Sequence, residues 1–235
     1  MIAGLPMYER PELFQAHNNL WQLIHKQIDE SPQKLSRNVE LWDLWTSPEL
    51  LLAQTCSSPY REILFKNTIY IGTPDYKLPT CPPGYYNSII IGQSGLSFSQ
   101  LKTGIFGYND KFSHSGWTAP INHFKNLDIS PEKTIKTGSH RSSAQAVADG
   151  QIEFAAIDAQ SWRFIKKYDK FANKIKVFDQ TEPTPGLPFI TSKPGLKDKL
   201  FCAIKKAIQA LSDQDRSLLY LKDLIKLDEE KYIKI

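Results

Sequence analysis

The sequence predicts an α/β protein of two lobes, in which each lobe has a mostly parallel sheet flanked by helices. Strand-like runs of β-branched and aromatic residues alternate with amphipathic segments along the chain, which is typical of strands joined by crossover helices. Residues 181–188 hold three prolines and one glycine and interrupt this alternation. A length of 235 residues is enough for one large domain or two small ones. We therefore expect two lobes joined by two crossing segments.

The first lobe is predicted to open with a strand and a long amphipathic helix. Over residues 11–28, Leu13, Leu20 and Ile24 fall on one helical stripe, and Pro11 fits the first turn. Apolar or β-branched runs between turn residues define the other elements of this part. They are a strand at 2–8, a strand at 50–55, a helix at 60–66, a strand at 68–74 and a Pro-rich loop at 75–85.

The middle of the chain repeats the alternation and forms the predicted second lobe. We expect strands at 86–92, 104–110, 133–138, 153–158 and 175–180, and helices near Leu101, from Gly116, at 139–150 and at 159–168. After the break, a strand at 189–192 and helices at 196–211 and 213–221 complete the fold. Residues 1–88 and 180–235 are thus expected to form lobe one, and residues 89–179 lobe two.

Composition argues against several classes of protein. The longest apolar runs are only a few residues long, so we expect no membrane insertion. A net charge of +4 is too weak to predict nucleic-acid binding. Three cysteines without paired short spacing, and five histidines without a metal-binding spacing, predict neither a disulfide framework nor a metal site or other cofactor. No signal peptide is visible, which predicts a cytoplasmic protein as written, or a periplasmic one if an upstream signal is missing.

Two loops between a strand and a helix are the best candidates for a binding site, because ligands bind at the carboxyl ends of strands in such sheets. The first contains Ser113, His114, Ser115 and Gly116. Two hydroxyls and a glycine at a helix start outline an anion cradle, although a plain serine N-cap explains the same residues.

The second loop contains Ser139, His140 and Arg141. Arg141 is suited to grip an anion with two N–H groups, and His140 can be neutral or charged near pH 7. Both loops lie in residues 89–178, which carry 12 basic and 7 acidic side chains. This balance favours an anionic ligand.

Three further residues have alternative interpretations. Asp158 follows an apolar strand, where it caps the next helix or binds an amine or hydroxyl of the ligand. Tyr8 lies at the end of the first predicted strand and is a further candidate for ligand binding. Cys56 is a buried inert thiol, or a nucleophile if His114, His123 or His140 lies near it in space.

Several segments resemble the phosphonate-type periplasmic binding proteins of ABC transporters. The resemblance is clearest in TGSHRSSAQAVADGQIEFAAIDAQSW, and it extends to SHSG, SPELLLAQTCSSPYR and TEPTPGLPF. It implies the type II periplasmic-binding-protein fold. In that family, the groups that match Ser113, Ser115 and His140 hold phosphonate or phosphate oxygens, and a carboxylate near Asp158 meets the far end of the ligand. The family's usual Ser-Thr-Ser-Gly is Ser-His-Ser-Gly here, so His114 replaces a hydroxyl.

The function predicted from the sequence is binding of a small anionic solute, such as phosphonate, phosphate or a related organic anion, without catalysis. An ABC-transporter permease, or a partner that reads a sensor, is the expected protein partner. Two alternatives stay open at this point. One is a cofactor-biosynthesis or thiol-dependent enzyme on the same fold, and the other is a stand-alone cytoplasmic anion sensor.

Overall fold

The computed structural model describes residues 1–97, 103–131 and 133–234 and divides into two compact units. Unit 1 comprises Met1–Tyr85 and Pro185–Ile235, and unit 2 comprises Tyr86–Thr184. The sequence prediction placed the boundaries at 88/89 and 179/180, but these positions lie within strands of unit 2. The predicted helical piece at Leu101 falls outside the described residues.

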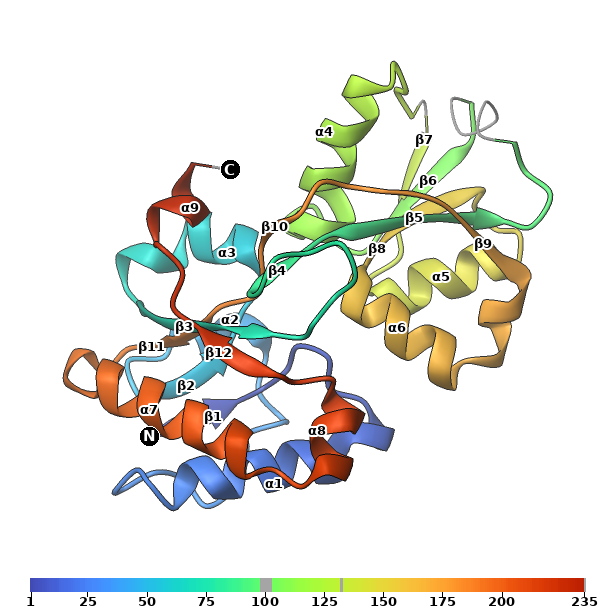
Figure 1. Ribbon diagram of the computed structural model, residues 1–235. Coiled ribbons are helices and arrows are strands. Elements are labelled where there is room, and N and C mark those ends of the chain that lie inside the picture. Colours follow the sequence, from blue (N-terminus) through green and yellow to red (C-terminus); the bar gives the residue numbers. More distant parts are fainter. Residues whose placement is uncertain (98–102, 132, 235) are drawn as a thin grey trace. The chain divides into compact units, whose positions relative to one another are not determined.

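Unit 1 is a five-stranded sheet in the order β1-β2-β11-β3-β12. Helices α1, α7 and α8 pack together beside the sheet (Figure 1). The strands are β1 (Ile2–Gly4), β2 (Leu50–Gln54), β3 (Ile69–Asp75), β11 (Phe189–Thr191) and β12 (Asp223–Ile225). The helices are α1 (Phe14–His25), α2 (Leu41–Trp45), α3 (Ser57–Glu62), α7 (Lys197–Ala210), α8 (Asp213–Leu219) and α9 (Glu230–Ile233), with 3-10 turns η1 (Pro11–Leu13), η2 (Leu64–Lys66) and η6 (Pro194–Leu196).

Unit 2 is a second five-stranded sheet, in the order β7-β6-β8-β5-β9. Helix α4 covers one face of it, and α5 and α6 cover the other (Figure 1). The strands are β5 (Ser88–Gln93), β6 (Ile105–Tyr108), β7 (Lys133–Lys136), β8 (Phe154–Asp158) and β9 (Ile175–Gln180). The helices are a π-helical turn η4 (His114–Thr118), α4 (Ala119–Asn126), α5 (His140–Ala148), α6 (Ala159–Tyr168) and a 3-10 turn η5 (Lys170–Lys174).

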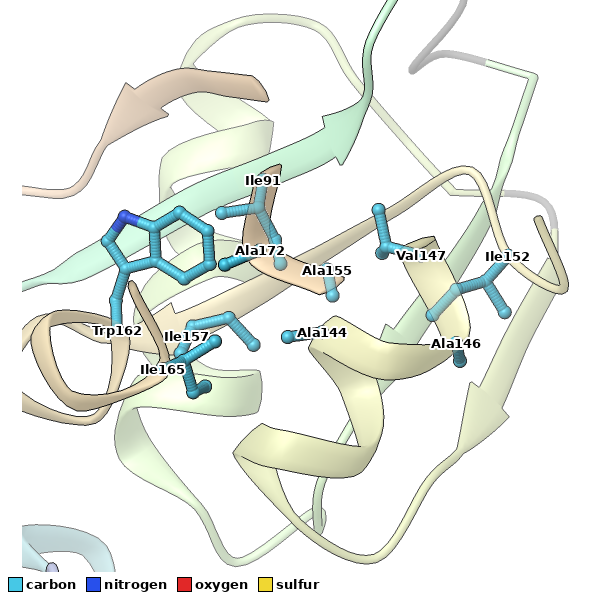
Figure 2. Packing of buried hydrophobic residues seen from close by; sticks show 10 residues of the cluster. All are labelled: Ile91, Ala144, Ala146, Val147, Ile152, Ala155, Ile157, Trp162, Ile165 and Ala172. Carbon is cyan, nitrogen blue, oxygen red and sulfur yellow. The ribbon is translucent and has the colours of Figure 1, made fainter. Parts of the chain in front are cut away.

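Alternating side chains of the central strands build the core of unit 2. Ile91, Ala155 and Ile157 face α5 and α6, where they meet Trp162 and the other residues of the cluster in Figure 2. Their neighbours in the chain, such as Ile90, face α4 on the opposite side. A strand buried on both faces reads as an unbroken apolar run, which is why this part of the fold was predictable.

The prediction of mostly parallel sheets was wrong in detail, because both sheets are mixed. Strands β1 and β2 pair in parallel, as do β6 with β7 and with β8. In contrast, β11 runs antiparallel to both of its neighbours, and so does β5. A helical crossover makes the strands that it joins run in the same direction. The chain enters β5 and β11 directly from a crossing segment, so no crossover sets their direction.

The two crossing segments pair with each other through β4 (Tyr85–Tyr86) and β10 (Thr184–Pro185). Just outside this pair, Gly186 N–H donates to the carbonyl of Gly84 over 2.8 Å. The buried hydroxyl of Tyr232, on α9, donates to the carbonyl of Gly186 over 2.9 Å. Helix α9 therefore holds the unit 1 end of the second crossing segment.

Candidate ligand-binding site

The first predicted loop follows β6 and leads into η4 and α4. Ser113 is the N-cap, and its Oγ accepts a hydrogen bond from Gly116 N–H over 3.0 Å. Ser113, His114 and Ser115 are each less than one-tenth exposed. The capping interpretation is thus correct for Ser113, and the same contact holds the loop in a fixed form.

Gly116 is required by the close approach of Asn109, a residue that was not among the predicted site residues. A Cβ atom at position 116 would lie 1.7 Å from Asn109 Oδ1 and 2.8 Å from its Cγ. In the described residues, Asn109 Oδ1 is buried and has no hydrogen-bond partner. The only sequence signal for Asn109 was its place directly after a strand. The Asn109 amide oxygen is therefore a buried hydrogen-bond acceptor at the base of the first loop.

The second predicted loop follows β7 and leads into α5. Gly138 has φ +89°, a left-handed conformation that favours glycine. Ser139 is the N-cap, and its Oγ accepts from Ser142 N–H over 3.0 Å. Thr137 and the buried Ser143 hydrogen-bond to each other through their hydroxyls. Serine capping therefore also explains Ser139.

Hydrogen bonds join the two loops. Thr137 N–H donates to Tyr108 O over 2.8 Å, and Gly138 N–H donates to Asn109 O over 3.2 Å. Between the side chains, Ser115 Oγ lies 3.0 Å from His140 Nε2. The structure thus brings together Ser115 and His140, two of the predicted site residues, where η4 and α5 begin.

His140 is neutral in this environment at pH 7. The residue as a whole is half-buried, but its ring nitrogen Nδ1 is enclosed. Burial lowers the pKa of His140 from 6.5 to about 4, and a hydrogen bond with the backbone of Ala156 opposes this shift. The sequence had left the protonation state open. A neutral imidazole has one nitrogen that donates a hydrogen bond and one that accepts, and it carries no net charge.

His114 points to the crossing segments. Its Nε2 lies 3.1 Å from Thr184 Oγ1 on β10, and its ring lies against that of Tyr86 on β4, with centroids 6.1 Å apart. Neither Thr184 nor Tyr86 was predicted to belong to the site. Both contacts join residues about 30 or more positions apart, and no local pattern in the sequence signals them.

Arg141 and Asp158 have other partners in this structure. Arg141 Nε and Nη2 lie 2.9 and 2.8 Å from Asp169 Oδ1, and the guanidinium lies over the ring of Phe171. Asp158 caps α6, since its Oδ1 accepts from Ser161 N–H over 2.8 Å. The structure therefore supports the capping interpretation of Asp158, and ligand contacts by either residue stay predictions.

Tyr8 and Cys56 belong to unit 1. Tyr8 has φ +65° and packs edge-on against Tyr76. Cys56 is the N-cap residue of the short helix α3, whereas His114, His123 and His140 all lie in unit 2.

Among the described residues, no group of three or more His, Cys, Asp or Glu side chains is placed to hold a metal ion. None of the described helices combines the length and apolar character needed to span a bilayer.

Two α/β units joined by two crossing segments give the chain the fold of type II periplasmic-binding-protein-like structures. The family model described as "ABC transporter, phosphonate, periplasmic substrate-binding protein" matches residues 78–232. The chain belongs to this family, whose members are transport components. Among curated proteins, none matches the chain by sequence.

Solved structures share the whole fold at low sequence identity. PhnD1 from Prochlorococcus marinus, in complex with methylphosphonate, is 17% identical with a TM-score of 0.77, and the match covers 100% of this chain and 94% of that one. A phosphonate-transporter binding protein from Pseudomonas aeruginosa is 18% identical with a TM-score of 0.74, covering 99% and 82%. A Xanthomonas citri protein bound to chloride ion is 12% identical with a TM-score of 0.69, covering 98% and 92%.

Proposed function

We propose that this protein binds a small oxyanion, a phosphonate, phosphate or related organic anion, through the two loops of unit 2. The observation that carries the proposal is the Ser115–His140 pair, which is held at the starts of η4 and α5. A helix start presents unpaired backbone N–H groups and the positive end of the helix dipole. An anion placed there meets hydroxyl, imidazole and backbone donors together.

The chemistry of the pair suits an anion that must also be released. His140 is neutral at pH 7, so binding requires no buried permanent ion pair. Hydrogen bonds from neutral groups to a charged ligand typically contribute about 1.5–3 kcal/mol each. Arg141, the nearest cation in sequence, is held by Asp169. We infer that oriented neutral donors, and not a cationic side chain, supply the main attraction.

Family membership supports the biological setting of this proposal. The family model describes a periplasmic substrate-binding protein of an ABC transporter. We infer that the protein delivers its ligand, without chemical change, to an ABC-transporter permease on the periplasmic side. The methylphosphonate in the similar structure of PhnD1 makes that compound the first ligand to test. Phosphate, sulfate and malate extend the test to other small anions.

Calorimetric titration tests the proposal at pH 7.5. The wild type is expected to bind at least one of these anions saturably, and Ser115→Ala is expected to weaken binding by about ten- to a hundredfold. Ser217→Ala is the matched control, because Ser217 is exposed on α8 of unit 1. Equal affinity in Ser115→Ala and Ser217→Ala, with unchanged melting temperatures, would remove the Ser115–His140 pair from the site.

A further inference from the structure

The side chain of His114, in the first loop, contacts both connecting strands. His114 lies between Ser113 and Ser115 in the chain and is 2% exposed. Its Nε2 lies 3.1 Å from Thr184 Oγ1 on β10, and its ring contacts that of Tyr86 on β4. Strands β4 and β10 pair with each other, and the buried imidazole of His114 contacts one residue of each.

The connection is held from its other end as well. The carbonyl of Gly186, two residues after Thr184, accepts the buried hydroxyl of Tyr232 over 2.9 Å. Gly186 N–H in turn donates to the carbonyl of Gly84, two residues before Tyr86. The short strands β4 and β10 are thus fixed by α9 on the unit 1 side and by His114 on the unit 2 side. A displacement of His114 must act on the connection directly.

We propose that His114 is a positioning residue that couples occupancy of the anion-binding loop to the connecting strands. The inference rests on the proposed function. Ser115 follows His114 directly and contacts His140 on the second loop, so a ligand that displaces Ser115 also displaces the His114 backbone. The imidazole passes that movement to Thr184 and Tyr86. In this role, His114 passes ligand binding on to the connecting strands β4 and β10, and its imidazole does not itself touch the ligand.

This role differs from the ligand contact that the sequence predicted for His114. A ligand-contacting His114 would act on the ligand through a ring nitrogen, whereas the role proposed here acts through the contact of Nε2 with Thr184 on β10. The two roles also differ in their coupling. If His114 acts through Thr184, removing the Thr184 hydroxyl has the same consequence as removing the ring nitrogen. Removing both adds nothing further.

Three variants test the coupling. Thr184→Val removes the hydroxyl and keeps the shape, His114→Phe keeps a ring against Tyr86 and removes the nitrogen, and the double variant combines them. The matched control is His123→Phe, because His123 pairs with Asp179 in the same unit at 2.8 Å. Melting temperatures show that each protein is folded. Methylphosphonate affinity is measured by calorimetry, and the radius of gyration is measured by X-ray scattering with and without ligand.

We expect both single variants to bind methylphosphonate about 2- to 30-fold more weakly and to show a smaller ligand-induced change in radius of gyration than the wild type. The double variant should match His114→Phe, and His123→Phe should behave as wild type. Additive effects of the two substitutions, or an unchanged response in Thr184→Val, would overturn the coupling alone. A wild type that binds none of methylphosphonate, phosphate, sulfate and malate would refute the proposed function and the coupling with it.

Discussion

Gly116→Ala is expected to destabilise unit 2 and to weaken anion binding. The added Cβ would lie 1.7 Å from Asn109 Oδ1, 2.8 Å from Asn109 Cγ and 3.1 Å from Ser113 Oγ. Non-bonded heavy atoms are comfortable only at about 3.5–4.0 Å. The Asn109 amide must therefore turn away, or the start of η4 must shift. Overpacking of this kind costs about 1–3 kcal/mol. Because Ser113 and Ser115 precede Gly116 in the same loop, a shift there also disturbs the proposed binding site.

Urea unfolding followed by circular dichroism, together with calorimetric titration, measures both effects. Gly195→Ala is the matched control, since a Cβ there meets no atom within 4 Å. The second test is Asn109→Ala, which removes the two closest atoms. In that background, Gly116→Ala should cost much less free energy of unfolding than in the wild type. If Gly116→Ala is as harmless as Gly195→Ala, or if Asn109→Ala gives no relief, the packing argument for this loop is wrong.

Three other predictions concern stability. Burial, and then the charge of Arg37, lower the pKa of His17 to about 4, so this group stabilises the fold above pH 6.5 and the contribution is lost as pH falls from 6.5 to 4. Between pH 7 and 4, His17→Gln should lose about 3 kcal/mol less free energy of unfolding than the wild type in urea titrations. Equal losses would contradict the shift. Ser139→Ala should cost about 1 kcal/mol in the same assay and Ser139→Asp much less, because aspartate also caps a helix; equal costs would exclude the cap. Tyr232→Phe should lower the free energy of unfolding by about 1–3 kcal/mol, since the buried carbonyl of Gly186 loses its donor. An unchanged value would mean that the hydroxyl is dispensable.

Local spacing explains which features of the site were predictable. The side chains of three capping residues each accept a hydrogen bond from the backbone N–H three residues later in the chain. These residues are Ser113, Ser139 and Asp158. That pattern is visible in the sequence, as are the strand before each loop and the helix after it. The capping alternative given for the first loop and for Asp158 held, and Ser139 is a cap as well. The family resemblance likewise rested on these helix starts.

Contacts between distant segments explain what was missed. The Ser115–His140 pair spans 25 residues, Arg141–Asp169 spans 28 and His114–Thr184 spans 70. Each depends on which strands are neighbours, and local periodicity does not contain that information. Two other differences have the same origin. The directions of β5 and β11 follow from where the chain changes unit, and the neutral state of His140 follows from what encloses its ring.

The most direct test of the central claim is the ¹H–¹⁵N correlation spectrum of the histidine rings at pH 7, recorded during titration with methylphosphonate. His140→Gln assigns the His140 signals, and His25, which bonds Ser31 in unit 1, is the internal reference. Before ligand is added, His140 should show the pattern of a neutral ring. Its Nε2 resonance should then shift saturably while the His25 resonances stay in place. Saturable binding that leaves the His140 resonances unchanged would contradict the assignment of the anion to these two loops.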